Sequence, residues 1–188
     1  ENILGEQPPI VFKGPPDSFG IGFFYNKDQL ATVSSVGLLE WNSPTEPSEM
    51  LVDGFSAGTT SAAFNSERTR IAVGFEDSTI QLLEVNGSIY DSYSLGETDN
   101  SVELLEYAPW QNLLAASYAD GRLVVWQEGG GGGATQESKP FDIPGLGVMR
   151  AMTFTPDTTD YDRGGLLMAD EEGVIRYQDM RGGVDIKT

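Results

Sequence analysis

Apolar and polar positions along this chain recur at a spacing much longer than a helical turn or a single strand. One eight-residue pattern, a turn followed by an apolar strand, occurs four times, at Ser35–Asn42, Asp77–Glu84, Asp120–Gln127 and Glu172–Asp179. Successive copies start 42, 43 and 52 residues apart. Such self-similarity is typical of repeat architectures in which each unit is one supersecondary structure. The 3.6-residue periodicity of amphipathic helices is absent, so we expect units built of strands.

Each unit carries further strand signals on both sides of this pattern. A short apolar segment precedes the pattern, and an aromatic residue with turn formers, such as Phe64-Asn65-Ser66, precedes that segment. A fourth strand is expected after each pattern, at Met50–Val52, Ile89–Ser94, Phe141–Ile143 and Val184–Lys187. Asn86-Gly87 predicts a tight hairpin because both residues tolerate positive φ. Four strands per unit at this pitch predict a β-propeller blade, whereas the strands of a sandwich show no such pitch.

The expected fold class is therefore all-β, a single propeller segment over residues 1–188 with about four blades of four antiparallel strands. The blades are expected at 18–53, 59–95, 101–144 and 148–187, after the outer strand of another blade at 10–13. A glycine-rich insert at 128–138 is expected to lack fixed structure. Four blades and a surplus strand do not close neatly into a ring. We expect a fragment of a larger ring, or a chain that other chains complete, because the terminal blades would otherwise leave open edges.

The repeats resemble those of the WD-repeat propeller family from residue 18 to residue 187. Asp77–Glu84 and Asp120–Gln127 are closest to that family's D-G-x-[IV]-x-[LV]-W-D strand ending. Its Trp is present as Trp41 and Trp126 and is replaced by Leu83 and Gln178, and its final Asp is present only as Asp179. The family's Gly-His dipeptide is missing, so we expect no Asp-His-Ser-Trp hydrogen-bond network, and propellers with other repeat sequences stay an alternative. The resemblance implies an interaction scaffold, and a ring in the family most commonly has seven blades.

Composition narrows the class of partner. The chain has 29 acidic and 11 basic residues, a net charge of −18, which disfavours nucleic acid and anionic membranes and favours basic proteins. Cysteine and histidine are absent, which excludes thiol nucleophiles, the usual zinc sites and triads with an imidazole base. We expect no cofactor and no metal. No apolar run approaches the roughly 18 residues of a membrane span, and an intracellular location is favoured.

Blade geometry predicts that the turns between second and third strands share one face with the links between blades. In this register that face collects acids with hardly any basic residue among them, whereas the opposite face carries both signs. The acids proposed for partner binding are Glu76, Asp77, Glu97, Asp99, Asp120, Asp170, Glu171 and Glu172. Converging carboxylates attract basic segments and accept bidentate bonds from Arg. Trp110, at a turn, is a further contact candidate because an exposed aromatic ring makes a good anchor; Trp41 and Trp126 are expected to pack within blades.

Other functions have weaker signals. The segment Asp157–Asp162 is rich in hard oxygen ligands but lacks the order of a calcium loop, so a hydrophilic turn is expected there. Gln178-Asp179-Met180-Arg181 resembles the W-D-x-R ending with which some WD-repeat proteins dock onto a ubiquitin ligase adaptor, although Gln replaces Trp. A propeller glycosidase would use paired carboxylates. However, Ser117-Tyr118-Ala119-Asp120 does not match the Ser-x-Asp box of sialidase-like propellers, and we expect no enzyme.

Overall fold

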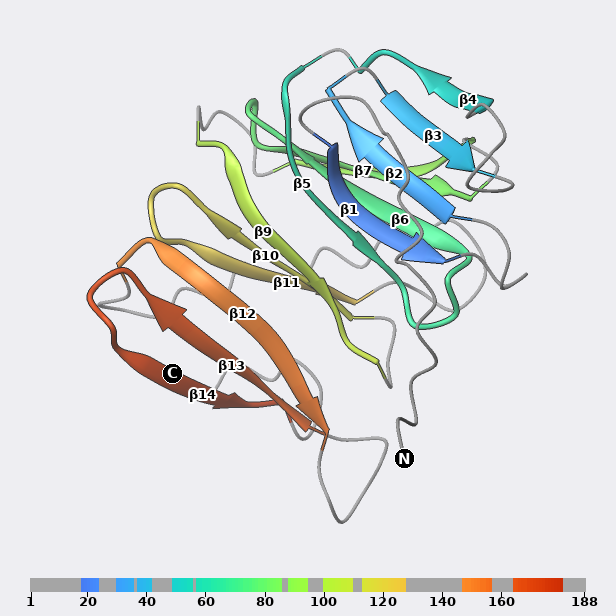
Figure 1. Cartoon of the computed structure of the whole chain (residues 1–188). Coiled ribbons are helices and arrows are strands. Elements are labelled where there is room, and N and C mark those ends of the chain that lie inside the picture. Colours follow the sequence, from blue (N-terminus) through green and yellow to red (C-terminus); the bar gives the residue numbers. More distant parts are fainter. Residues whose placement is uncertain are drawn as a thin grey trace, which may run out of the picture.

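The computed structural model describes residues 18–23, 30–35, 37–41, 49–55, 57–85, 88–94, 100–109, 113–127, 147–156 and 164–180. All the regular elements in these ranges are β-strands, fourteen in number. They form four separate antiparallel sheets, and each sheet is built of strands that follow one another in the sequence (Figure 1). The expectation of an all-β chain with small antiparallel sheets of consecutive strands is therefore confirmed.

The first sheet contains β1 (Ser18–Phe23), β2 (Leu30–Ser34), β3 (Gly37–Trp41) and β4 (Glu49–Asp53). The second contains β5 (Thr59–Phe64), β6 (Arg70–Phe75), β7 (Thr79–Glu84) and β8 (Ile89–Ser94). The third contains β9 (Val102–Tyr107), β10 (Leu113–Tyr118) and β11 (Leu123–Gln127). The fourth contains β12 (Met149–Pro156), β13 (Gly164–Asp170) and β14 (Ile175–Asp179).

Several expectations lie outside the described residues. These are the outer strand at 10–13, the Asn86-Gly87 turn, the insert at 128–138 and the fourth strands at Phe141–Ile143 and Val184–Lys187. The third and fourth sheets are accordingly described with three strands each. In the first two sheets, where four strands are described, β8 has the bounds that the sequence predicted and β4 contains the expected Met50–Val52.

The sheets stack in chain order, and their first strands lie next to one another: β1 contacts β5, β5 contacts β9, and β9 contacts β12 (Figure 1). The leading face of a sheet is the face that packs on the next sheet along the chain, and the trailing face is the other one. Between the second and third sheets, Ala72, Ile80 and Leu82 on the leading face meet Leu114 and Trp126 on the trailing face. Equivalent apolar clusters join the first sheet to the second and the third sheet to the fourth.

Strand β10 shows why the inner strands read as continuous apolar runs. Every residue from Leu113 to Tyr118 is buried, because Leu114 and Ala116 face the second sheet while Leu113 and Ala115 face the fourth. A strand covered on both faces has no need of polar alternation. Full burial of one Leu side chain contributes about 1.5–3 kcal/mol to stability. Because the buried side chains lie between sheets, the packing of one sheet on the next forms most of the core.

Trp41 and Trp126 are both buried, each 7% exposed, which confirms that they pack within the sheets. One side-chain hydrogen bond, which is not the Asp-His-Ser-Trp network, joins two strands of the first sheet. The indole Nε1 of Trp41 donates to Thr32 Oγ1 at 3.2 Å, from β3 to β2. In the second, third and fourth sheets the register places Val73, Ala116 and Met168 at the position of Thr32. None of these three side chains has a hydroxyl, so this bond is possible in the first sheet only.

Candidate functional site: an acidic edge of the stack

Three turns between second and third strands lie along the same side of the stack. In Figure 1 the β6–β7, β10–β11 and β13–β14 turns all face the upper left. Hydrogen bonds link the last two of these turns to the segment that leads into the first strand of the same sheet: the Ala119 amide donates to the Ser101 carbonyl, and the Glu171 amide donates to the Val148 carbonyl. We call this side the acidic edge; its described acids from the sequence prediction are Glu76, Asp77, Asp120, Asp170, Glu171 and Glu172. Glu97, Asp99 and Trp110 lie outside the described residues.

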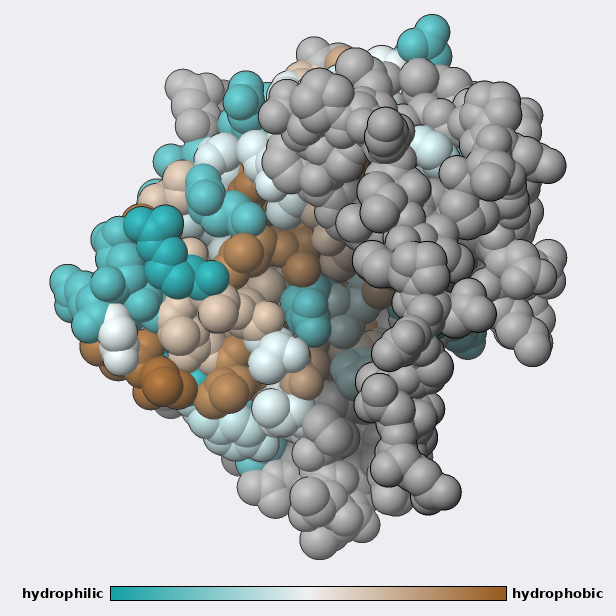
Figure 2. Space-filling view, viewed as in Figure 1, coloured by the Kyte–Doolittle hydropathy of each residue, from teal (hydrophilic) through white to brown (hydrophobic). Residues whose placement is uncertain are grey.

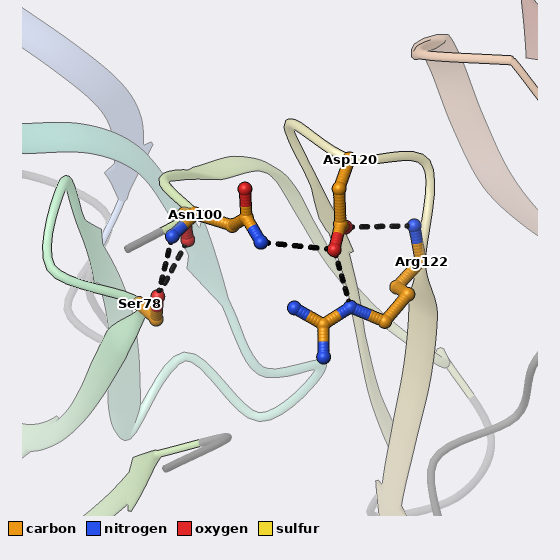
Figure 3. Close-up of polar contacts among 4 residues, drawn as sticks. All are labelled: Ser78, Asn100, Asp120 and Arg122. Carbon is orange, nitrogen blue, oxygen red and sulfur yellow. Dashed lines mark hydrogen bonds and ion pairs between the residues drawn. The ribbon is translucent and has the colours of Figure 1, made fainter. Parts of the chain in front are cut away.

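Ser78 joins the second sheet to the third at this edge (Figure 3). Its hydroxyl donates to the Asn100 carbonyl at 2.7 Å and accepts from the Asn100 amide at 3.1 Å. Ser78 has a φ of 69°, and the equivalent turn positions in the third and fourth sheets are Gly121 and Gly173, with φ of 85° and 82°. A positive φ costs a non-glycine residue about 1–3 kcal/mol and persists only where other contacts hold it. The two bonds to Asn100 are such contacts.

Asp120 continues this network on the third sheet (Figure 3). Its carboxylate accepts from the Asn100 side-chain amide at 2.9 Å and from the Arg122 amide at 3.1 Å. The Arg122 guanidinium forms an ion pair with the same carboxylate. Asp120 therefore holds the conformation of its own turn. Its negative charge is partly neutralised by the Arg122 guanidinium.

Asp170 has a similar local role in the fourth sheet. Its carboxylate accepts from the Val174 amide at 2.9 Å and from the Glu172 amide at 3.0 Å. The hydrogen bond from the Val174 amide is the main cause that holds the pKa of this carboxyl below its ordinary value. The amides of Gly147 and Glu172 and the nearby Arg176 also lower this pKa, whereas burial raises it. This carboxylate stays ionised, but it is turned into the loop and not toward a partner.

Two arginines correct the expectation that the edge would have hardly any basic residue. Arg122 pairs with Asp120, and the Arg150 guanidinium lies 3.1 Å from the Glu171 carboxylate. Asp77 accepts from the Thr79 amide at 3.1 Å, so it too caps its own turn. Glu76 and Glu172 are exposed, and none of the hydrogen bonds or ion pairs described above involves their side chains.

The sequence prediction missed several residues of this edge. Asp53 is exposed at the end of β4, where it pairs with Gly37 beside the β2–β3 turn, so the first sheet also contributes an acid. Ser78 and Asn100 are uncharged and gave no signal of partner binding, although the serine in place of the turn glycine was visible in the repeat. The contact between Ser78 and Asn100 joins residues 22 positions apart, so local sequence patterns do not predict it.

The opposite edge carries both signs in its described part, as expected. At the β5–β6 turn, Asn65 Oδ1 accepts from the amides of Thr69 and Arg70, and this bonding fixes the hairpin. Glu67 and Arg68 are exposed there, and Arg70 lies 3.9 Å from Glu84. The register of the repeats also assigns Lys27, Asp28, Asp157, Arg163 and Arg181 to this edge, but these residues lie outside the described ranges. The acidic edge therefore differs in charge from the opposite edge of the same sheets, which carries both signs.

The residues of the rejected sialidase-like box are placed away from solvent. Ser117 and Tyr118 are fully buried, and Tyr118 belongs to the apolar cluster between the second and third sheets. Burial raises the pKa of the Tyr118 phenol far above its ordinary value. Neither side chain is positioned to contact a substrate.

Within the described ranges, no group of three or more acidic side chains is arranged to hold a metal ion. The same part of the chain contains no helix long and apolar enough to cross a membrane. The calcium-like segment Asp157–Asp162 is outside these ranges.

Comparison with known proteins gives one informative similarity. No family model matches the chain. It is 38% identical over 82 residues to "Protein transport protein SEC13-2" of Candida glabrata, a WD-repeat propeller protein. The matched region is 40% of this chain and 27% of that relative, so the chain spans about a quarter of the relative's length. The similarity is distant and partial, and it agrees with the resemblance found in the repeats.

Proposed function

We propose that this chain is a segment of a WD-repeat β-propeller that acts as an interaction scaffold, without catalytic activity of its own, in an assembly with other proteins. The stacking of four small sheets with adjacent first strands supports the propeller, since blades around an axis contact one another in this order. The similarity to a protein transport protein supports membership of a protein assembly. In this proposal the ring is completed by further blades, whether of a longer chain or of partner chains.

We propose further that the acidic edge binds a basic segment of a partner protein. The observation that carries this is the convergence of acids from successive sheets, with the exposed Glu76 and Glu172 as the first contacts. Asp120 and Asp170 fix the shape of the turns, so the surface is already formed before a partner arrives. Complementary charge of this kind raises association rates and selects partners more than it adds affinity.

Titration of the chain with a peptide rich in Lys and Arg tests the edge. We expect affinity to fall as salt rises from about 50 to about 300 mM, because screening weakens exposed charge pairs. Glu76→Gln is expected to weaken binding by about two- to fivefold, the effect of one exposed ion pair. Glu67→Gln, which removes the same charge from the opposite edge, is the matched control and should change little.

A variant that gains affinity separates this proposal from damage to the fold. Arg150→Gln removes the basic partner of Glu171 and is expected to strengthen peptide binding at low salt. Binding that ignores salt, or equal losses in Glu76→Gln and Glu67→Gln, would exclude the acidic edge as the binding surface.

A further inference from the structure

Gly58 lies directly against the Glu76 carboxylate at the acidic edge. It precedes β5, and its carbonyl accepts a hydrogen bond from the Glu76 amide at 2.9 Å. A Cβ placed on Gly58 would meet the carboxylate carbon of Glu76 at 2.6 Å and the two carboxylate oxygens at 2.7 and 2.9 Å. These distances are far below the roughly 3.5–4.0 Å of van der Waals contact. The carboxylate can therefore occupy this position only because residue 58 has no side chain.

The repeats show the same pair of positions with other residues. Two bonds of the same kind, from an amide of the turn to a carbonyl before the first strand, identify the equivalent pairs: Ser101 with Ala119 in the third sheet, and Val148 with Glu171 in the fourth. In the third sheet the position of the acid is an alanine, and in the fourth the Glu171 carboxylate forms an ion pair with Arg150. Of the three sheets in which both positions are described, only the second combines a glycine with an exposed carboxylate.

The charge of the acidic edge therefore differs from one turn to the next. Figure 2 shows hydrophilic, teal atoms gathered at the left of the view, where the β10–β11 and β13–β14 turns lie in Figure 1. At both of these turns an arginine lies against an acid, Arg122 against Asp120 and Arg150 against Glu171. None of the ion pairs among the described residues involves Glu76. The β6–β7 turn thus presents a carboxylate that no basic residue of the described chain neutralises by direct contact.

We propose that Gly58 is a positioning residue of the acidic edge: it leaves the space of its Cβ to the Glu76 carboxylate and so places this charge where the basic segment of a partner binds first. This inference rests on the proposed function, in which Glu76 is a first contact. Gly58 has no side chain to offer the partner and acts through Glu76. A carboxylate that is already in place loses less conformational freedom on binding, and the ion pair is stronger for that reason.

The variant Gly58→Ala moves this charge without removing it. The atoms that the new methyl group displaces are the end of a flexible side chain, so they can shift at little cost to the fold. Gly58 is not among the described glycines with a positive φ, and an alanine at such a position should leave the melting temperature unchanged or slightly higher. We expect weaker binding in a variant at least as stable as the parent, a combination that damage to the fold does not produce.

A double-mutant cycle measures whether Gly58 acts through Glu76. The parent, Gly58→Ala, Glu76→Gln and the double variant are titrated with the same peptide rich in Lys and Arg at about 50 mM salt. We expect Gly58→Ala to weaken binding about twofold, and by no more than Glu76→Gln does. In the Glu76→Gln background it should have no further effect, because no charge remains there to be displaced. At about 300 mM salt the loss in Gly58→Ala should shrink, since screening weakens the ion pair.

Gly147→Ala is the matched control. Gly147 lies before the first strand of the fourth sheet, beside Glu171, and it also lacks a positive φ. A Cβ there would lie 3.7 Å from the nearest atom, Glu171 Cγ, which is an ordinary van der Waals distance. The substitution adds the same methyl group at the same edge but displaces no carboxylate. Its peptide binding should equal that of the parent.

Binding that Gly58→Ala leaves unchanged or strengthens, while Glu76→Gln weakens it, would overturn the role of Gly58 and leave the proposed function intact. An equal loss from Gly58→Ala in both backgrounds would also overturn it, because the residue would then act by another route than Glu76. If Glu76→Gln itself leaves binding unchanged, Glu76 is not a contact, and the proposed binding at this turn is wrong together with the role of Gly58.

Discussion

The third and fourth sheets carry the same strand pattern with opposite outcomes on their leading faces. Leu123 and Val125 of β11 are buried beneath the fourth sheet, whereas Ile175 and Tyr177 at the equivalent positions of β14 face solvent. Both pairs follow a turn with a glycine at positive φ and both pair with their second strand in the same register. The pattern therefore determines how a strand pairs, and the neighbouring sheet determines what its residues contribute to stability.

The largest expected effect is the contrast between Leu123→Ala and Ile175→Ala. Leu123 is fully buried, so its truncation should lower the free energy of unfolding by about 2–5 kcal/mol, since lost burial and a residual cavity both contribute. Ile175→Ala should cost about 0.5 kcal/mol or less, as is usual for an exposed position. Denaturant unfolding at low protein concentration measures both values. Similar losses in the two variants would mean that the leading face of the fourth sheet is already covered.

The second expected effect concerns the turns that join the sheets. Ser78→Ala removes both bonds to Asn100 and keeps a side chain at positive φ, so we expect a loss of about 1–2 kcal/mol in unfolding free energy. Ser78→Gly loses the same bonds but adopts this φ without strain, and should be less destabilising. Thermal unfolding of the two variants compares these terms. If glycine proves the worse of the two, strain at Ser78 is not a significant cost.

The smallest expected effects come from two carboxyls whose pKa values move in opposite directions. Burial raises the pKa of Glu106, and the hydrogen bond from Thr153 opposes this rise. The contribution of Glu106 to the free energy of unfolding therefore falls as the pH rises through its pKa in the folded state. Glu106→Gln should raise the melting temperature at neutral pH and lose that advantage in acid. The lowered pKa of Asp170 has the reverse sign: its contribution is present above about pH 4, the unfolded value, and is lost as pH falls.

For Asp170→Asn, we therefore expect a lower melting temperature at neutral pH and a difference that shrinks in acid. Melting curves of both variants between neutral pH and about pH 3 provide the measurement. A pair of variants whose differences from the parent stay constant with pH would show that neither carboxyl is coupled to folding in this way.

Much of the fold could be predicted from the sequence because strand signals are local. The apolar runs of β10 and β11, the turn at Asp120-Gly121 and the bounds of β8 all follow from residues close together in the chain. The candidate site was predicted less completely. Its acids were found from their place in the repeat, but Arg150 beside Glu171 and Asn100 beside Asp120 join positions about 20 residues apart, and no pattern in one sequence reveals such pairs.

By itself, the sequence determined that the chain forms small antiparallel sheets in succession and that acids occupy the turns between second and third strands. Only the tertiary structure decided which of these acids are bound up in their own turns, that Thr32 bonds to Trp41, and that one apolar face is left uncovered. The physical reason is that strand pairing and turn conformation depend on short-range backbone preferences. Burial and ion pairing depend instead on which sheets come to lie against each other.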